Sequence, residues 1–291
     1  DISSPEKRAK TFGLIGVAFG LSFFLGNIFV VIFAKNTNNN FIIPVLIASI
    51  IPIINFLLVF FYLPETKPNN TSNKLKTILK NPFKQLFIVF KEEKIKKLSL
   101  AFFIYFIAFT GLTNILIFFL QESLNWTTKA SSGTLVLVGI IAIIVQGGLI
   151  GPLVKKFGEM RLTLIGSGFI LVACSLLITA PKENATINIY TAVSFLAVGA
   201  GLITPTLRAL ISKKLEVDKQ GSILSNLQGL QSLGGVLGIA MAGRVYDGFG
   251  PKSPFIAGSI ILIFMIYLIA EGKNNNFIYN QNQDHLNEKS G

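Results

Sequence analysis

The sequence predicts an all-α protein, a polytopic bundle of membrane-spanning helices. Eight stretches of 18 or more residues contain no Asp, Glu, Lys or Arg, and a helix needs roughly 20 apolar residues to cross a hydrocarbon core of about 30 Å. The stretches lack the alternation of polar and apolar residues that strands of a membrane barrel show. They are 11–34, 36–64, 98–121, 130–154, 162–181, 184–207, 220–243 and 253–270.

The placement of the basic residues predicts how these helices are oriented. With the start of the chain assigned to the cytoplasm, 21 Lys and Arg residues fall in cytoplasmic segments and 5 in the opposite ones. This bias agrees with the positive-inside rule. It also argues against a nucleic-acid partner, because the net charge of +12 is divided among loops and forms no single basic face. We therefore expect a multi-pass protein of the cell (inner) membrane, with both ends of the sequence in the cytoplasm.

The first two stretches, within residues 1–64, are expected to be the last two helices of an N-terminal bundle. Gly16 and Gly20 are spaced i, i+4, which allows another helix to pack closely, and Asn27 lies near that face. The segment 65–97 then forms a cytoplasmic linker, in which Lys residues mix with Leu, Ile and Phe at helical spacing. This pattern is typical of an interfacial helix on an anionic membrane surface. A solvated linker is the alternative.

Six stretches follow the linker, and six helices make a complete bundle. We therefore predict a C-terminal six-helix bundle over 98–271 and a polar cytoplasmic tail over 272–291. A complete bundle preceded by only two helices indicates a partner bundle, and if that bundle also has six helices, four more are expected upstream. The chain opens at Asp1 rather than at Met. Paired bundles of this kind are expected in secondary transporters.

Uncharged polar side chains inside the stretches are the candidate substrate-binding residues, because a buried amide or hydroxyl in lipid needs a partner. In the seventh stretch, Gln228 and Gln231 share one helical face with Gly235 and Gly238. The other candidates are Asn27, Thr113, Asn114 and Gln146. Contact with a substrate and hydrogen bonds between helices are both open interpretations of these residues.

The loop between the fourth and fifth stretches, on the predicted cytoplasmic side, is the most specific motif. Gly151 would let a neighbouring helix approach, and Gly158 would supply a flexible turn. The cations would meet acidic groups or helix C-termini at the inner surface. A charged hairpin of this kind can act as a gate that makes contacts in one conformation only. The predicted cytoplasmic gate comprises Gly151, Lys155, Lys156, Gly158, Glu159 and Arg161.

These residues resemble the major facilitator superfamily, whose loop between helices 8 and 9 has the form Gly-x-Leu-x-x-[Arg/Lys]-x-Gly-[Glu/Arg]-x-Arg. The form is matched by Gly151, Leu153, Lys156, Gly158, Glu159 and Arg161. Four further segments resemble the entry into helix 5, the exit of helix 6, the passage from helix 10 to helix 11, and the end of helix 11. They are 1–13, 64–66, 204–221 and 246–255. The resemblance implies the major facilitator fold, with eight of its twelve transmembrane helices present, numbers 5 to 12.

Among the branches of that superfamily, the tetracycline and multidrug efflux group is the most similar. This implies a secondary active transporter that exports a small amphipathic or drug-like solute by alternating access, with proton antiport. Asn27 departs from the pattern, since antiporters of the group carry Pro there, and Lys155 stands where the related loop of the first half carries an acidic residue. The stretches contain no acidic residue, so a coupling carboxylate would lie upstream or at Glu122 or Asp247.

No enzymatic function, metal site or cofactor is expected. Cys174 and His285 are the only Cys and His residues, so the sequence offers neither a thiol metal site nor a catalytic triad, and it has no phosphate-binding loop. The expected partners are a small-molecule substrate, the lipid bilayer and protons. Two other interpretations are a sugar or amino-acid carrier of the same superfamily and a non-transporting membrane scaffold or degraded remnant.

Overall fold

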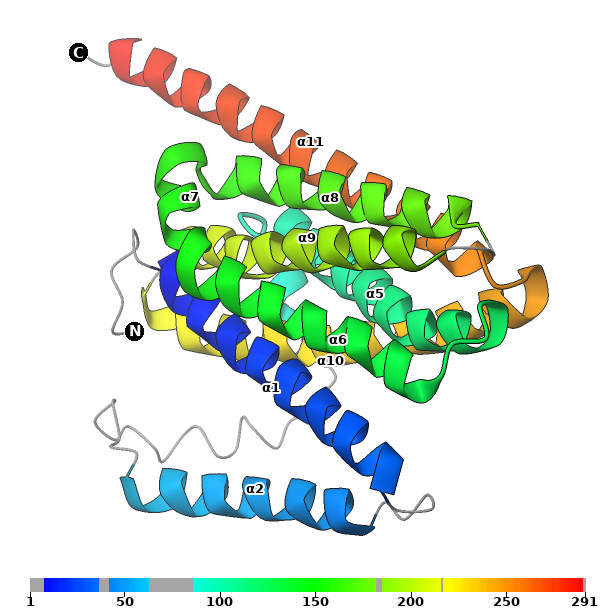
Figure 1. The fold of residues 1–291 in the computed structure, drawn as a ribbon. Coiled ribbons are helices and arrows are strands. Elements are labelled where there is room, and N and C mark those ends of the chain that lie inside the picture. Colours follow the sequence, from blue (N-terminus) through cyan, green and yellow to red (C-terminus); the bar gives the residue numbers. More distant parts are fainter. Residues whose placement is uncertain (1–7, 37–41, 63–85, 182–184, 216, 290–291) are drawn as a thin grey trace.

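The computed structural model describes residues 8–36, 42–62, 86–181, 185–215 and 217–289, and every regular element among them is a helix. The long helices follow the predicted stretches in order (Figure 1). They are α1 (Arg8–Asn36), α2 (Ile42–Tyr62), α5 (Lys96–Phe118), α6 (Thr128–Ile143) continued by α7 (Ile150–Phe157), α8 (Glu159–Thr179), α9 (Ala185–Lys213), α10 (Val217–Phe249) and α11 (Ser253–Lys289).

Seven of the described helical segments are long and apolar enough to cross a membrane. The eighth predicted stretch, 220–243, is helical within α10 and long enough, but it does not reach the same apolarity. Gln, Ser, Asn and Gly interrupt its apolar residues. A helix that turns polar residues toward the interior of a bundle does not need to be apolar all round. The prediction of a polytopic helical membrane protein is confirmed.

Two of the helices contain π-helical turns where the sequence predicts uninterrupted helices. α5 ends in η3 (Phe119–Ser123), and η4 (Ile144–Leu149) joins α6 to α7. A π-helical turn adds one residue to the repeating hydrogen-bond pattern and is frequent at functional sites. η4 contains Gln146, so the helical phase changes at a predicted binding residue.

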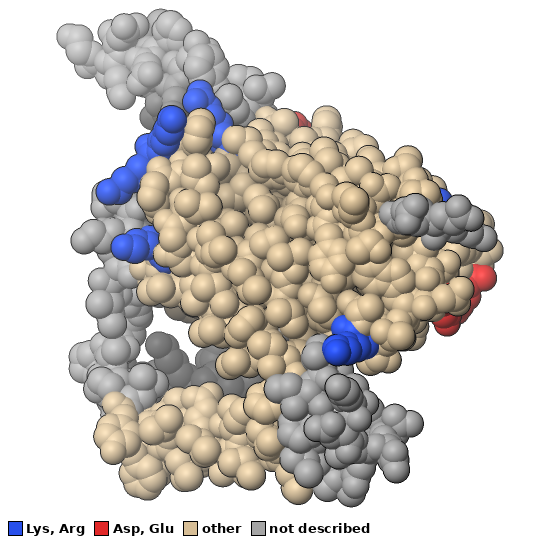
Figure 2. Space-filling model, in the orientation of Figure 1, with Lys and Arg blue, Asp and Glu red and all other residues tan. Residues whose placement is uncertain are grey.

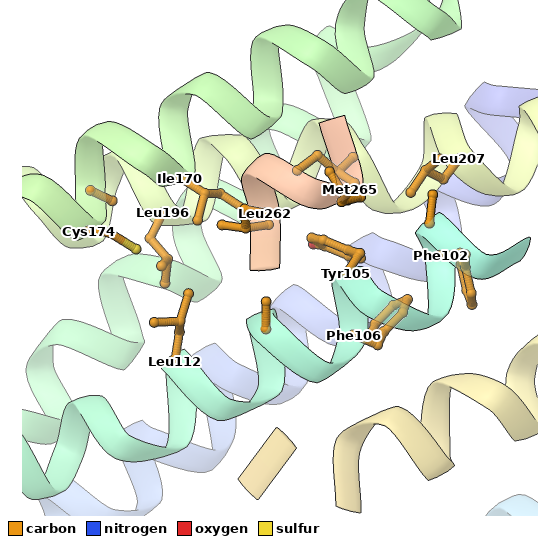
Figure 3. Close-up of a cluster of buried hydrophobic side chains, with 14 of the residues drawn as sticks. Phe102, Tyr105, Phe106, Leu112, Ile170, Cys174, Leu196, Leu207, Leu262 and Met265 are labelled. Carbon is orange, nitrogen blue, oxygen red and sulfur yellow. The ribbon is translucent and has the colours of Figure 1, made fainter. Parts of the chain in front are cut away.

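The main hydrophobic core lies between α5, α8, α9 and α11. Ring centroids of Phe102 and Phe106, on successive turns of α5, are 4.8 Å apart. The core side chains labelled in Figure 3 are Phe102, Tyr105, Phe106 and Leu112 of α5, Ile170 and Cys174 of α8, Leu196 and Leu207 of α9, and Leu262 and Met265 of α11. Lipid is as apolar as these side chains, so close packing holds them together. Phe106 of α5 and Ala197 of α9 belong to this core and also line a cavity on the other side of it.

Contacts of α1 with α6 and α9 attach the first helix to the rest of the bundle (Figure 1). A Cβ atom on Gly139 of α6 would lie 2.6 Å from the backbone nitrogen of Phe24 and 2.7 Å from the carbonyl oxygen of Gly20. Both are backbone atoms of α1, so only glycine fits at this crossing. The close packing predicted at Gly20 is therefore present, and α6 is the partner helix. α2 contacts α1, and its described side chains are almost all exposed, as expected for a lipid-facing helix.

Charged side chains gather toward the ends of the bundle, and the face between them is largely uncharged (Figure 2). Lys155, Lys156 and Arg161 are exposed where α7 meets α8. An uncharged belt between charged ends is the surface that a bilayer requires.

Two predicted segments lie beside or beyond the bundle. Most of the predicted linker helix is outside the described residues, and its described end forms a short 3-10 turn, η2 (Phe87–Phe90), that packs against α5 and α10. Most of the predicted tail, 272–291, is helical and continues α11 to Lys289. This end of α11 projects from the bundle in Figure 1. A helix of 37 residues is about 55 Å long, which exceeds a bilayer core of about 30 Å.

Candidate functional site

A cavity of about 450 Å³ lies between α1, α5, α6, α9 and α10, and we call it the central cavity. Its lining residues come from the middle part of these helices, and none of the described ones is charged. Phe106 and Phe109 form an aromatic part of the wall, small apolar residues and glycines form much of the remainder, and hydroxyl and amide groups supply its polar part. A mostly apolar cavity of this size with a few polar groups is typical of small-molecule sites.

Five of the six predicted substrate-binding residues line the central cavity. They are Thr113 and Asn114 of α5, Gln146 of η4, and Gln228 and Gln231 of α10. The sixth, Asn27, lies two turns beyond Gly20 on α1 and is not among the lining residues. Asn27 is partly exposed and has an interaction of its own. The fold therefore brings together residues that are far apart in the chain and leaves Asn27 outside the group.

Gln146 enters the cavity wall through space that a glycine of α1 leaves open. A Cβ atom on Gly16 would lie only 1.4 Å from Oε1 of Gln146, so the amide occupies the place of a side chain at position 16. The Gln146 side chain is buried, and its Oε1 has no hydrogen-bond partner among the described residues. Leaving a buried acceptor without a partner costs roughly 1–3 kcal/mol. A ligand that donates a hydrogen bond here would remove this cost.

The polar groups of α5 form hydrogen bonds within their own helix. The Thr113 hydroxyl donates to the carbonyl oxygen of Phe109 at 2.9 Å, and Nδ2 of Asn114 donates to that of Thr110 at 2.9 Å. Such back-bonding satisfies donors without another helix. The Asn114 amide oxygen is left available as an acceptor. This wall therefore combines an aromatic surface with hydrogen-bond acceptors.

Arg208 is the residue near the cavity that the sequence reasoning missed. It follows directly after the charge-free stretch that ends at 207, one helical turn beyond Thr204, which lines the cavity. Its side chain is buried, and Nη2 donates to Oε1 of Gln228 at 2.8 Å and to Oε1 of Gln231. The ring of Phe102 lies 5.7 Å from Cζ. The sequence does contain a signal for this residue, because Arg208 lies directly at the edge of a charge-free stretch. The positive-inside bias alone counts it as an ordinary loop cation.

The predicted gate is a sharp turn between α7 and α8. Gly158 has φ +75° and ψ 159°, a backbone region that is essentially restricted to glycine. The next residue, Glu159, begins α8, and its carboxylate accepts a hydrogen bond from Nζ of Lys213 at 2.6 Å. An acid at the start of α8 and a base at the end of α9 also suit the dipoles of these helices. The turn is thereby tied to α9.

The cations of the gate lie at the surface and make none of the described ion pairs. They are Lys155, Lys156 and Arg161. The helix that approaches Gly151 is α1, through Lys10. A Cβ atom on Gly151 would lie 3.7 Å from Cδ of Lys10, which is an ordinary contact distance. Space alone therefore does not require glycine at 151, whereas the backbone conformation requires it at 158.

Among the described residues, a second cavity gathers charged side chains, and the two predicted carboxylates lie elsewhere. A second cavity of about 410 Å³ near the start of α8 is lined by four lysines and one glutamate, and burial lowers the pKa of one of the lysines, Lys214. The two predicted candidate carboxylates, Glu122 and Asp247, are exposed, and Glu122 accepts a hydrogen bond from the Tyr246 hydroxyl at 2.9 Å. Neither carboxylate lines the central cavity.

The Glu159–Lys213 ion pair should contribute measurably to the stability of the bundle. Glu159→Gln keeps the shape of the side chain and removes its charge, and we expect the free energy of unfolding to fall by about 1 kcal/mol, the upper part of the range for ion pairs at a surface. The Glu159 side chain is 11% exposed, whereas Glu93, which pairs with Lys96 at 3.4 Å, is 83% exposed. Thermal unfolding should therefore detect Glu159→Gln and not Glu93→Gln. Equal unfolding temperatures for wild type and Glu159→Gln would contradict this.

Comparison with known proteins identifies relatives over most of the chain. A model of the Major Facilitator Superfamily matches residues 1–239. Tetracycline resistance protein, class B, of Escherichia coli is 24% identical over 250 residues, 85% of this chain and 60% of that protein. Multidrug resistance protein 2 of Bacillus subtilis (strain 168) is 27% identical over 274 residues, 90% and 64% of the two chains. Major facilitator superfamily domain-containing protein 10 of Mus musculus is 23% identical over 290 residues, 92% and 61%. The chain thus spans less than two thirds of the length of these relatives.

A solved structure shows the same fold. The crystal structure of the human organic anion transporter MFSD10 (TETRAN) superimposes with a TM-score of 0.74 and 20% sequence identity, over 92% of this chain and 65% of that chain. The likeness confirms the predicted helical arrangement, with part of the bundle present.

Proposed function

Since the chain belongs to the Major Facilitator Superfamily, we propose that it works in a secondary active transporter that exports a small amphipathic solute by proton antiport. The observation that carries the proposal is the central cavity, about 450 Å³ in volume, lined by uncharged residues and surrounded by five helices. Its aromatic wall suits the apolar part of a solute. Its amides and hydroxyls suit a few polar groups.

Alternating access would operate by rocking of two bundles about this cavity. α1, which we assign to the first bundle, contributes Gly16 and Gly20 to the cavity wall and crosses α6 at Gly139. The wall is then shared between the bundles, so a relative movement would open and close it. The turn at Gly158, with its neighbouring cations, would close the cytoplasmic side in one of the two states.

The amount of drug that accumulates in cells tests both the direction of transport and the class of solute. Bacteria that lack their own drug exporters and express the complete protein in the inner membrane should accumulate less of at least one of two amphipathic compounds, tetracycline and ethidium, than cells with an empty vector. A protonophore should abolish the difference if export is coupled to protons. Unchanged accumulation of both compounds would contradict drug export, and uptake of labelled sugars and amino acids would then test the metabolite carrier.

Gln146 offers a test of the central cavity as the solute site. Its Oε1 has no partner among the described residues, so Gln146→Leu leaves no other group unpaired and should preserve the amount of folded protein. We expect the KM for export to rise by about two- to tenfold, the effect of one hydrogen bond of roughly 0.5–1.5 kcal/mol. Gln121→Leu, at a glutamine outside the cavity lining, is the matched control and should leave KM unchanged. An unchanged KM in Gln146→Leu would remove this residue from the solute site.

A further inference from the structure

Two amides of the central cavity are held in one orientation by a buried cation. Nη2 of Arg208 donates to Oε1 of Gln228 at 2.8 Å and also to Oε1 of Gln231. A guanidinium has only donors, so the amide atom that faces it must be oxygen in both residues. The amide nitrogen of each glutamine therefore points away from Arg208. Since both glutamines line the cavity and Arg208 does not, the groups they offer to a solute are N–H donors.

The positive charge of Arg208 has no anionic partner among the described residues. The residue is 8% exposed, and none of the described ion pairs includes it. Two amide oxygens and the face of Phe102 are its neighbours, and Nε has no hydrogen-bond partner. Removing a charge from water is costly without a counter-charge, and a cation within a membrane helix is usually retained for a function. An anionic group on a solute in the adjacent cavity would supply the missing counter-charge.

We propose that the central cavity binds solutes that carry a carboxylate more tightly than otherwise matched uncharged solutes, and that Arg208 is the positioning residue for this preference. The amide N–H groups of Gln228 and Gln231 donate to the carboxylate oxygens, and Arg208 behind them supplies the favourable charge. The apolar part of the solute packs on Phe106 and Phe109. This inference rests on the proposed function, because it takes the central cavity as the solute site, and it adds the charge class of the solute.

A binding assay with two matched fluorescent probes tests the charge class separately from transport. Dansylglycine carries a free carboxylate and an aromatic ring system, and dansylglycinamide differs only in having an uncharged amide there. The Kd of each probe is measured from dansyl fluorescence with the purified complete protein. Wild type should bind dansylglycine at least about tenfold more tightly, since hydrogen bonds to a charged group are worth roughly 1.5–3 kcal/mol.

Two substitutions separate the positioning role from a structural one. Arg208→Gln should weaken dansylglycine binding about tenfold or more and leave dansylglycinamide within about twofold, because the charge and the fixed amide orientation are both lost. The double variant Gln228→Glu with Gln231→Glu keeps acceptors for Arg208 and should fold, but it removes both donors and places two carboxylates beside the single cation, so the site has no net positive charge. It should therefore lose the preference for the carboxylate probe as fully as Arg208→Gln does.

Three results would overturn the inference. The first is equal affinity of wild type for the two probes, or no binding of dansylglycine. The second is an equal loss of affinity for both probes in Arg208→Gln, which would show that Arg208 has a purely structural role. The third is a retained preference in the double glutamate variant. None of these results affects the tetracycline and ethidium accumulation assay, so failure of the charge class and failure of the proposed transport can be told apart.

Discussion

Replacing Gly158 with Leu is expected to abolish transport while leaving insertion into the membrane intact. With φ at +75° and ψ at 159°, position 158 has a conformation that other residues adopt only at a cost of about 1–3 kcal/mol. Apart from its two chain neighbours, no residue has a heavy atom within 4 Å of a Cβ built at Gly158, so the penalty arises from the backbone and not from a clash. A cost of this size shifts an equilibrium between two conformations by about 5- to 150-fold. The turn between α7 and α8 would then leave the geometry that closes the gate.

The measurement is the initial rate of solute export at a matched amount of protein in the membrane. Gly168→Leu is the control, because Gly168 lies inside α8 and a Cβ there also meets nothing within 4 Å. That variant should export at the wild-type rate. Gly158→Ala should be nearly as inactive as Gly158→Leu, since the strain depends on the Cβ atom rather than on side-chain volume. Full export by Gly158→Leu would refute the role of this turn as a gate.

The second large effect is expected at the crossing of α1 and α6. Gly139→Leu places a Cβ atom 2.6 Å from the backbone nitrogen of Phe24 and 2.7 Å from the carbonyl oxygen of Gly20. Backbone atoms of a helix cannot move aside individually, so α1 as a whole must shift away from α6. Gly16 and Gly20 form part of the cavity wall, and the shift would open that wall. We expect export to fall by at least about tenfold, since small residues set the distance between membrane helices.

Gly148→Leu is the matched control for this variant. Gly148 lies in η4, nine residues after Gly139 on the same helical segment, and a Cβ there meets nothing within 4 Å. It should therefore be tolerated. If Gly139→Leu exported at the wild-type rate with a normal expression level, the contact between α1 and α6 would have no part in transport.

Charge patterning along the chain is enough to locate the helices, because charged residues are excluded from the hydrocarbon core at a cost of several kcal/mol. Charge-free stretches such as 98–121 and 162–181 correspond closely to α5 and α8. The glycine turn at Gly158 was also readable, since its position between charged residues marks a loop. The stretch 130–154 shows what charge patterning cannot predict. It contains the π-helical turn η4, and nothing in its amino-acid composition distinguishes that turn from the α-helix around it.

Which polar residues meet depends on how the helices pack, and the chain alone does not show it. In the sequence, Asn27 cannot be told apart from Gln146, Gln228 and Thr113, because all four are uncharged polar residues in apolar stretches. The helices of the other three converge on one cavity, and Asn27 lies outside its lining. Arg208 pairs with two glutamines of α10 because α9 and α10 bring their side chains together within the bundle. The cost of burying a polar side chain is a property of that residue, so it can be read from the chain. Which side chains contact one another depends on how the helices cross and rotate, and packing across many residues sets that arrangement.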